Sequence, residues 1–258
     1  MTQIQVVVSM SYARSLLIFT FLFLLKLGLV KATPSSVYWT VCTTDIQADD
    51  IWHFGLDNYF TIFNGGGHGS SLPPDVGLTY GLFHWGDLAA EVGIDYLGGA
   101  KDPVFFNAKV GMAENVLFSK APSWSVGIYN VGTRTAGRGR TNQNIVDFIL
   151  GTSLPERIGG NLYIAAFSGS RAMGKNWQGW MIGFLRNFCK TKDCKDKEYY
   201  KWVLAADYAS GKNTIGGGGA GLYYYFTPDI SLLMGPVFFN DAKINGHWKW
   251  TIQLDINL

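Results

Sequence analysis

The last residues of the chain, WKWTIQLDINL at positions 248–258, decide the fold. Every second residue is apolar, and the residues between them are polar: Lys249, Thr251, Gln253, Asp255 and Asn257. Successive side chains of a β-strand point to opposite faces, whereas a helical period of 3.6 residues would mix the two sets. We therefore predict a strand with one face in an apolar environment and the other in a polar one.

The same alternation recurs upstream. It is clear at 75–83, 88–96, 106–112, 124–129 and 201–208, and fainter at 52–63, 144–154, 160–168, 177–186, 219–226 and 230–239. A transmembrane strand needs about 9–11 residues, whereas strands of soluble proteins have about 5–6, and most of these segments suit the longer class. We therefore predict strands that cross a membrane.

The connections between these strands sort by position. Those after the odd-numbered strands are rich in Gly, Ser and Asn, and three of those after the even-numbered strands are tight turns, at 84–87, 155–159 and 227–229. The long 187–198 connection departs from this rule. Long loops at one end and short turns at the other are typical of outer-membrane barrels. We predict an all-β fold, a transmembrane antiparallel up-and-down β-barrel of about 12 strands over residues 51–258.

Composition and the N-terminus agree with this prediction. The 258 residues are 48% hydrophobic and 16% charged, with 9 Trp, 13 Tyr and 17 Phe, which is too aromatic for a disordered chain. The one long apolar run lies near the N-terminus, so a bundle of membrane helices is excluded. We interpret residues 1–32 as a signal peptide, with an uncleaved anchor as the alternative. The remainder has 18 Lys and Arg against 19 Asp and Glu, which gives no support to a nucleic-acid partner.

With this leader, these alternating strands and this terminal strand, the chain resembles bacterial outer-membrane β-barrel proteins. The resemblance covers the whole mature chain, although no barrel family of known activity is matched. It implies a place in the outer membrane of a Gram-negative bacterium, contact with outer-membrane lipids, and folding by the barrel-assembly machinery. The terminal strand read by that machinery often ends in Phe, and here it ends in Leu258.

The polar faces of the strands carry charges of both signs, which we expect to face the lumen. The acids are Asp57, Glu91, Asp95, Asp147, Asp207 and Asp255, and the bases are Lys109, Arg186, Lys201 and Lys249. Glu91 and Lys109 belong to one hairpin. In an antiparallel hairpin the numbers of paired residues add up to a constant, and a sum near 200 would place these two opposite each other. These charges either hydrate a wet lumen or form a selective site.

The predicted outer loops are mainly basic. Their cations include Arg134, Arg138, Arg140, Arg171 and Lys175, which we call the basic mouth, together with Lys101, Lys212 and Lys243; their acids are Asp102 and Asp241. A positive mouth raises the local concentration of anions, and arginine also binds the phosphates of lipopolysaccharide well. Ordinary solvated loop charge is the third interpretation.

Motifs for catalysis or metal binding are weak. Of three cysteines, Cys189 and Cys194 lie close together in CKTKDC, and we expect a disulfide between them, with Cys42 left over. That pair has no neighbouring His and no CxxC spacing, so we predict no metal and no cofactor. The chain has four histidines, His53, His68, His84 and His247, but no GxSxG motif that would supply a nucleophilic serine. We therefore assign no catalytic residues.

Function is the open question. We expect a narrow channel for small solutes, anions among them, with a basic extracellular mouth. The alternatives are a non-conducting barrel for surface interaction or structure and, with less support, a barrel-embedded hydrolase. Glycines on the polar faces (Gly77, Gly81, Gly93, Gly111 and Gly127) favour an open bore, and residues 33–50 either stay in the periplasm or enter the bore as a plug.

Overall fold

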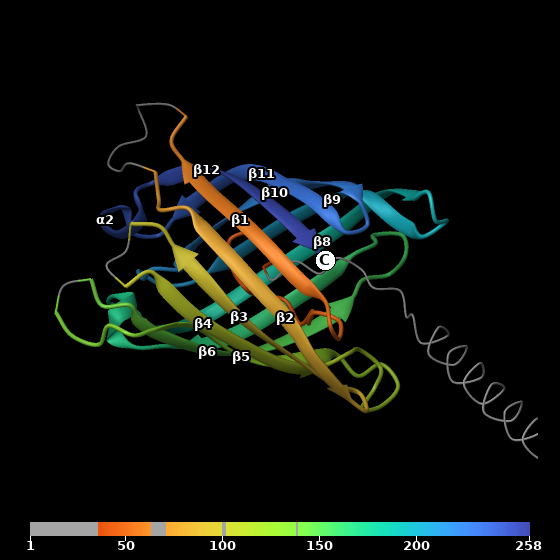
Figure 1. Cartoon of the computed structure of the whole chain (residues 1–258), viewed down its shortest axis with the longest axis horizontal. Helices are drawn as coiled ribbons and strands as arrows, with labels where there is room; N and C mark the ends of the chain where they lie inside the picture. Colours follow the sequence, from red (N-terminus) through yellow and green to blue (C-terminus); the bar gives the residue numbers. More distant parts are fainter. Residues whose placement is uncertain (1–35, 63–70, 100–101, 138) are drawn as a thin grey trace, which may run out of the picture. The chain divides into compact units, whose positions relative to one another are not determined.

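Twelve antiparallel strands close into a barrel in the computed structural model, which describes residues 36–62, 71–99, 102–137 and 139–258 (Figure 1). The strands are β1 (Trp52–Phe60), β2 (Asp75–Trp85), β3 (Leu88–Leu97), β4 (Val104–Met112), β5 (Ser123–Gly132), β6 (Asn142–Ser153), β7 (Asn161–Ser168), β8 (Gln178–Lys192), β9 (Glu198–Ala209), β10 (Gly217–Thr227), β11 (Ile230–Phe239) and β12 (Trp248–Asn257). Each strand pairs with the next in the sequence, and β12 pairs with β1. The predicted up-and-down barrel is confirmed. The predicted signal peptide, 1–32, lies outside the described residues.

The seam between β1 and β12 runs to the end of the chain. Leu56 pairs with Leu254 in the middle of this ladder. Beyond it, the amide of Leu258 donates to the carbonyl oxygen of Trp52 at 2.8 Å, and the amide of Trp52 donates back at 3.2 Å. Closure leaves no open sheet edge. Strands in lipid require such closure, because no water is present to form hydrogen bonds with unpaired backbone groups.

The two faces of each strand differ as the alternation predicts. On β12, Thr251 and Gln253 are almost completely buried inside the barrel, whereas Ile252 between them points outward and is 37% exposed. Other large apolar side chains are exposed around the outer surface, among them Trp180 at 54% and Phe238 at 56%. A closed barrel with an apolar outer face is the architecture of outer-membrane proteins, and this barrel belongs in a bacterial outer membrane.

The connections differ at the two ends of the barrel. At one end, the loop end, they span 61–74, 98–103, 133–141, 169–177, 210–216 and 240–247, and they include η1 (Arg171–Met173) and α2 (Ala242–Asn245). At the other, the turn end, they span 86–87, 113–122, 154–160, 193–197 and 228–229. The helices in the described part of the chain are too short to cross a membrane.

The hairpin of β8 and β9 is longer than predicted, and in Figure 1 it extends past the neighbouring strands at the turn end. The ladder continues to the pair Lys192–Glu198, and the Nζ of Lys190 lies 2.6 Å from a carboxylate oxygen of Glu198. The predicted 187–198 connection is therefore mostly strand, and its turn is only 193–197. The hairpin is thus a long pair of strands closed by a short turn.

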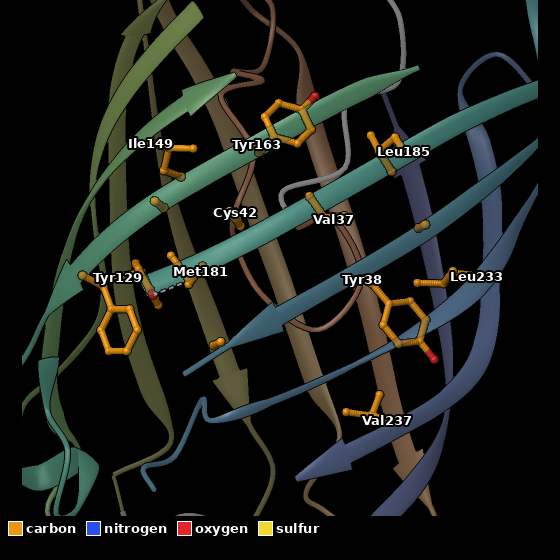
Figure 2. Close-up of a cluster of buried hydrophobic side chains, with 14 of the residues drawn as sticks. Val37, Tyr38, Cys42, Tyr129, Ile149, Tyr163, Met181, Leu185, Leu233 and Val237 are labelled. Carbon is orange, nitrogen blue, oxygen red and sulfur yellow. Dashed lines mark hydrogen bonds between the residues drawn. The ribbon is translucent and has the colours of Figure 1, made fainter. Parts of the chain in front are cut away.

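The hydrophobic core lies inside the barrel and on one side of it. Most inward-facing side chains of β6 to β11 are apolar and buried, as shown by Ile149, Met181 and Leu233 (Figure 2). The inward faces of β1 to β4 are instead mainly polar or glycine, as at Asp57 and Glu91. The lumen therefore has an apolar half and a polar half.

The outward face of β12 provides a test of membrane contact. Ile252→Arg should lower the free energy of unfolding by roughly 2–4 kcal/mol, because an arginine facing lipid near the bilayer midplane is costly. Ile256→Arg on the same face but nearer the turn end should cost about 0–1 kcal/mol. The measurement is reversible denaturant unfolding from lipid bilayers.

Ile252→Leu is the control, since it keeps an apolar side chain and should have little effect. Equal losses from Ile252→Arg and Ile256→Arg would contradict a depth-dependent lipid environment at this face.

Candidate functional site

Residues 36–48 lie inside the barrel and residues 49–51 lie at its turn end; we call 36–51 the lumen segment. Val37, Tyr38 and Cys42 have no exposed surface, and Figure 2 shows them surrounded by the barrel wall. The segment contacts β9 and β10 first, then β8 and β5, and finally β3 and β2. Of the predicted 33–50 segment, residues 36–48 thus lie in the bore, Asp49 and Asp50 are exposed at its turn end, and 33–35 lie outside the described residues.

Asp207 on β9 holds the start of the lumen segment. Its Oδ2 accepts hydrogen bonds from the backbone amides of Tyr38 at 3.0 Å, Trp39 at 2.9 Å and Thr40 at 2.7 Å. The hydroxyl of Thr40 donates a further bond at 2.9 Å. Three consecutive amides that converge on one anion form a nest, and bonds to an ionised acceptor are stronger than neutral ones. One carboxylate therefore satisfies backbone donors that have no strand partner.

The side chain of Tyr38 sits in a seat made of glycines. A Cβ added at Gly219 or Gly221 would lie 2.7 or 2.5 Å from its ring, and one at Gly235 would lie 2.7 Å from its hydroxyl. That hydroxyl donates to the carbonyl oxygen of Pro236 at 2.9 Å, and Gln253 donates to the carbonyl oxygen of Tyr38 at the same distance. These glycines make room for the segment and do not leave open space.

The later part of the lumen segment contacts the opposite wall. The hydroxyls of Thr44 and Ser123 are 2.7 Å apart, and the amide of Gln47 donates to Glu91 at 2.7 Å. Glu91 stands opposite Lys109 in the β3–β4 register, as the pairing sum predicts, and their charged groups are 3.1 Å apart. Glu91 therefore binds both the lumen segment and Lys109.

A cavity of about 380 Å³ lies between the lumen segment and β1 to β6 and extends to the loop end. Side chains of the segment line it at Ser36, Trp39 and Val41, and the loops line it at Leu72 and Asn245. Its ionisable lining is mainly acidic: Asp57, Asp75, Glu91, Asp95, Asp147 and Asp255, with Lys109 and His53. The polar half of the lumen is thus a cavity rich in carboxyl groups.

A second cavity of about 280 Å³ lies at the turn end. The lumen segment lines it at Thr44, Asp45 and Ile46, and Glu114 and His84 line it from the strand ends. The two cavities share no lining residue, although the segment contributes to both. The segment therefore lies along both of these cavities.

The structure places most of the predicted lumen residues on the inner face: Asp57, Glu91, Asp95, Lys109, Asp147, Asp207, Lys249 and Asp255. Arg186 is an exception, since it is exposed on the outer face and its guanidinium lies 4.9 Å from the ring centre of Phe188. The ammonium of Lys201, near the turn end, lies over the ring of Tyr224 at 5.4 Å and so is directed away from the cavity.

The residues of the basic mouth lie in loops at one end of the barrel. Arg171 and Lys175 belong to the 169–177 loop, and Arg134 and Arg140 belong to the 133–141 loop. Arg140 donates to the carbonyl oxygen of Arg171 at 3.2 Å, which brings the two loops together. Arg138 lies outside the described residues, as do Lys101 and His68.

The buried and half-exposed histidines bind carboxylates. The Nε2 of His53 is 3.3 Å from Asp255, and its Nδ1 is 2.8 Å from Asn257. His84 pairs with Asp49. No serine, threonine or cysteine joins either histidine among the hydrogen bonds of the described residues. In that same part of the chain, His, Cys, Asp and Glu side chains form no group of three or more suited to a metal.

The expected disulfide between Cys189 and Cys194 is not formed. Both are exposed free thiols, and Cys42 is a buried one. Cys189 lies within β8, which continues to Lys192, and Cys194 lies in the turn beyond it. An extended strand advances about 3.3 Å per residue, so the two Cα atoms are separated by more than a disulfide can span.

Alternation gives little indication of the residues that fix the lumen segment, namely Tyr38, Thr40 and Gln253. It assigns Gln253 to the lumen, but the partners Tyr38 and Tyr59 of its side chain lie more than 190 residues away along the chain. A usable signal is the recurrence of glycine at 183, 219, 221 and 235, on strands whose alternation is faint. Asp75 also lines the cavity and belongs to a polar face that the alternation already identified.

No family model matches the chain, and no curated protein matches its sequence significantly. Solved structures of outer-membrane barrels resemble it in fold. Among them are a KdgM porin (7% identity, 80% of this chain and 98% of that one, TM-score 0.46), the COG4313 outer membrane channel from Pseudomonas putida F1 (10%, 83% and 98%, 0.42) and a NanC porin (10%, 80% and 100%, 0.40). The likeness concerns the barrel alone.

The thiols provide a test of the lumen segment's position. In the folded protein, a maleimide should modify Cys189 and Cys194 but not Cys42, which has no exposed surface. Burial raises the pKa of the Cys42 thiol, and the carboxylates of Asp207 and Asp147 raise it further, so that little reactive thiolate is present. Mass spectrometry counts the modified thiols before and after unfolding.

Two modified thiols in the folded state and three after unfolding are the expected counts. Rapid modification of Cys42 in the folded protein would contradict a buried lumen segment, and protection of both Cys189 and Cys194 would favour the disulfide.

Proposed function

We propose that the protein is a narrow channel for small solutes across the outer membrane. The observation that carries this proposal is the loop-end cavity of about 380 Å³, which lies inside a closed barrel and is lined by charged side chains. A barrel with a purely structural role needs no hydrated space in its interior, since side chains alone can fill a small barrel. Twelve strands give a bore between filled eight-stranded barrels and open porins of 16–18 strands.

The charges suggest what such a channel would pass. The loop cations Arg134, Arg140, Arg171 and Lys175 would attract anions to the extracellular mouth. Beneath them, the cavity is lined by six carboxyl groups and by Lys109, whose charge is paired with that of Glu91. Fixed charge acts most strongly in the narrowest, least hydrated part of a path. We therefore propose that small cations are favoured in the cavity, although the loop charges alone would favour anions.

The same loop cations suit a second set of partners. Phosphate groups of lipopolysaccharide would meet Arg134, Arg140 and Arg171 at the membrane surface if the loop end is extracellular, and arginine binds phosphate through two parallel hydrogen bonds. Folding by the barrel-assembly machinery through β12 is part of the same proposal. Neither partner alters the role of the cavity.

One observation favours the non-conducting alternative. The lumen segment packs against the apolar half of the barrel, where Val37 and Tyr38 are fully buried. A barrel filled in this way would serve structure or surface interaction without passing solutes. That alternative predicts no ionic current under any condition, including those that release the segment.

Single-channel recording in planar bilayers tests the proposed channel. The wild type should show openings with a preference for cations. Asp57→Asn and Asp95→Asn should each lower the ratio of cation to anion permeability by at least about twofold, because each removes a fixed charge from a narrow passage. Glu156→Gln, on the exposed 154–160 turn, is the control and should leave the ratio unchanged.

The reversal potential in a salt gradient gives the permeability ratio directly. A preference for anions that neither cavity variant alters would contradict the role given to the carboxyl groups.

A further inference from the structure

We propose that Asp207 is a latch that holds the lumen segment across the bore, and that release of the segment from Asp207 opens the channel. This inference rests on the proposed channel function and assigns its gate. The segment lines both cavities of the lumen, and those cavities share no lining residue. Movement of the segment is therefore the change that would join the two spaces.

The seat of the latch is built across three strands. Asp207 on β9 stands opposite Gly183 on β8 and opposite Gly219 on β10. A Cβ at Gly183 would lie 2.9 Å from both the carbonyl oxygen of Cys42 and the Cγ2 of Val37, and one at Gly219 would lie 2.7 Å from the ring of Tyr38. Glycine on both sides of the carboxylate leaves room for the segment to reach it, which makes this row a docking place shaped for the segment.

All hydrogen bonds of this carboxylate in the described part of the chain go to the segment. Oδ2 accepts four, from Tyr38, Trp39 and Thr40, and Oδ1 is buried without a partner there. Asp147, another buried lumen carboxylate, instead accepts from the amide of Gly127 on the barrel wall. Asp207 therefore differs from a wall carboxylate in that its bonds exist only while the segment is docked.

The rest of the lumen segment is held by hydrogen bonds spread over several wall residues. Its backbone forms no ladder with a neighbouring strand except near Asp49 and Asp50, where it bonds to Gly81 of β2. The residues before that point are held by wall side chains, through the bond between Thr44 and Ser123 and the bond from the amide of Gln47 to Glu91. Loss of the four bonds to Asp207 should therefore release the start of the segment first, while Glu91 and Gly81 still hold its later part.

The first experiment removes the latch and measures the segment and the current separately. In the full-length protein with Cys189→Ser and Cys194→Ser, native Cys42 reports whether the segment is docked. Asp207→Ala should increase the rate of Cys42 modification at least about tenfold, because bonds to a charged acceptor are lost. It should also increase the open fraction in bilayers by at least about tenfold, as the same equilibrium governs both.

Asp147→Ala is the matched control, since it removes a buried lumen carboxylate that binds the wall. Because Asp147, like Asp207, raises the pKa of the Cys42 thiol, Asp147→Ala reports this electrostatic effect alone and should increase the Cys42 modification rate far less than Asp207→Ala does. Circular dichroism and the shift in gel mobility on heating verify that each variant forms the barrel.

The second experiment fixes the segment covalently in its docked position. The Cγ2 of Val37 lies 2.9 Å from the Cβ position of residue 183, a spacing that suits a disulfide between Val37→Cys and Gly183→Cys. Both substitutions are made with Asp207→Ala in a chain whose three native cysteines are serines. The oxidised protein should show the low wild-type open fraction, and reduction should restore the high one.

The outcomes separate the two proposals. If Asp207→Ala leaves both Cys42 modification and current unchanged, or if the oxidised disulfide does not lower the current, the latch is contradicted. If Cys42 becomes reactive but no variant ever conducts, the segment is released as inferred and the channel function itself is wrong.

Discussion

The structure depends on one constraint, which is that every buried backbone amide and carbonyl needs a partner. For the strands, lipid makes this constraint strict, and it is met by closing the sheet, so that β12 pairs with β1 as far as Leu258. For the lumen segment, no ladder is available over most of its length. The carboxylate of Asp207 takes the place of a neighbouring strand for three successive amides.

Much else in the lumen follows from the presence of the segment. The glycines of β8, β10 and β11 lie where Val37 and Tyr38 approach the wall. The apolar half of the lumen exists because those side chains need a dry surface, and the polar half remains as the cavity of about 380 Å³. Docking of the segment thus divides the interior into a packed side and a cavity lined by carboxyl groups.

The barrel could be predicted from the sequence because lipid outside and polar groups inside produce strict alternation, as in 248–258. The strands at 144–154, 160–168, 177–186, 219–226 and 230–239 showed this pattern only faintly. The structure explains why, since their inward faces carry Ile149, Met181, Leu233 and other apolar residues that pack in the core. Weak alternation thus accompanies the filled side of the lumen on five strands, although 52–63 is also faint with a polar inward face and 201–208 is clear beside the core.

The site was less predictable for a different physical reason. Alternation assigns a side chain to a face, and the structure has Asp57, Glu91 and Asp207 on the inner face of the barrel. It does not say which of them binds another part of the chain, because the contacts of Asp207 with Tyr38 and Thr40 join residues 169 and 167 apart in sequence. The expected disulfide was wrong because strand β8 extends through Cys189, which sequence spacing alone did not indicate.

The lumen segment has a fixed seat in the barrel, and that seat is open to measurement. Amide hydrogen exchange of the full-length protein in lipid bilayers, read by mass spectrometry over residues 36–48, reports whether the segment is docked. If the amides of Tyr38, Trp39 and Thr40 are bonded to Asp207, they should exchange slowly, with protection close to that of the neighbouring strand β9. Exchange of these three amides as fast as that of the 193–197 turn would contradict the account.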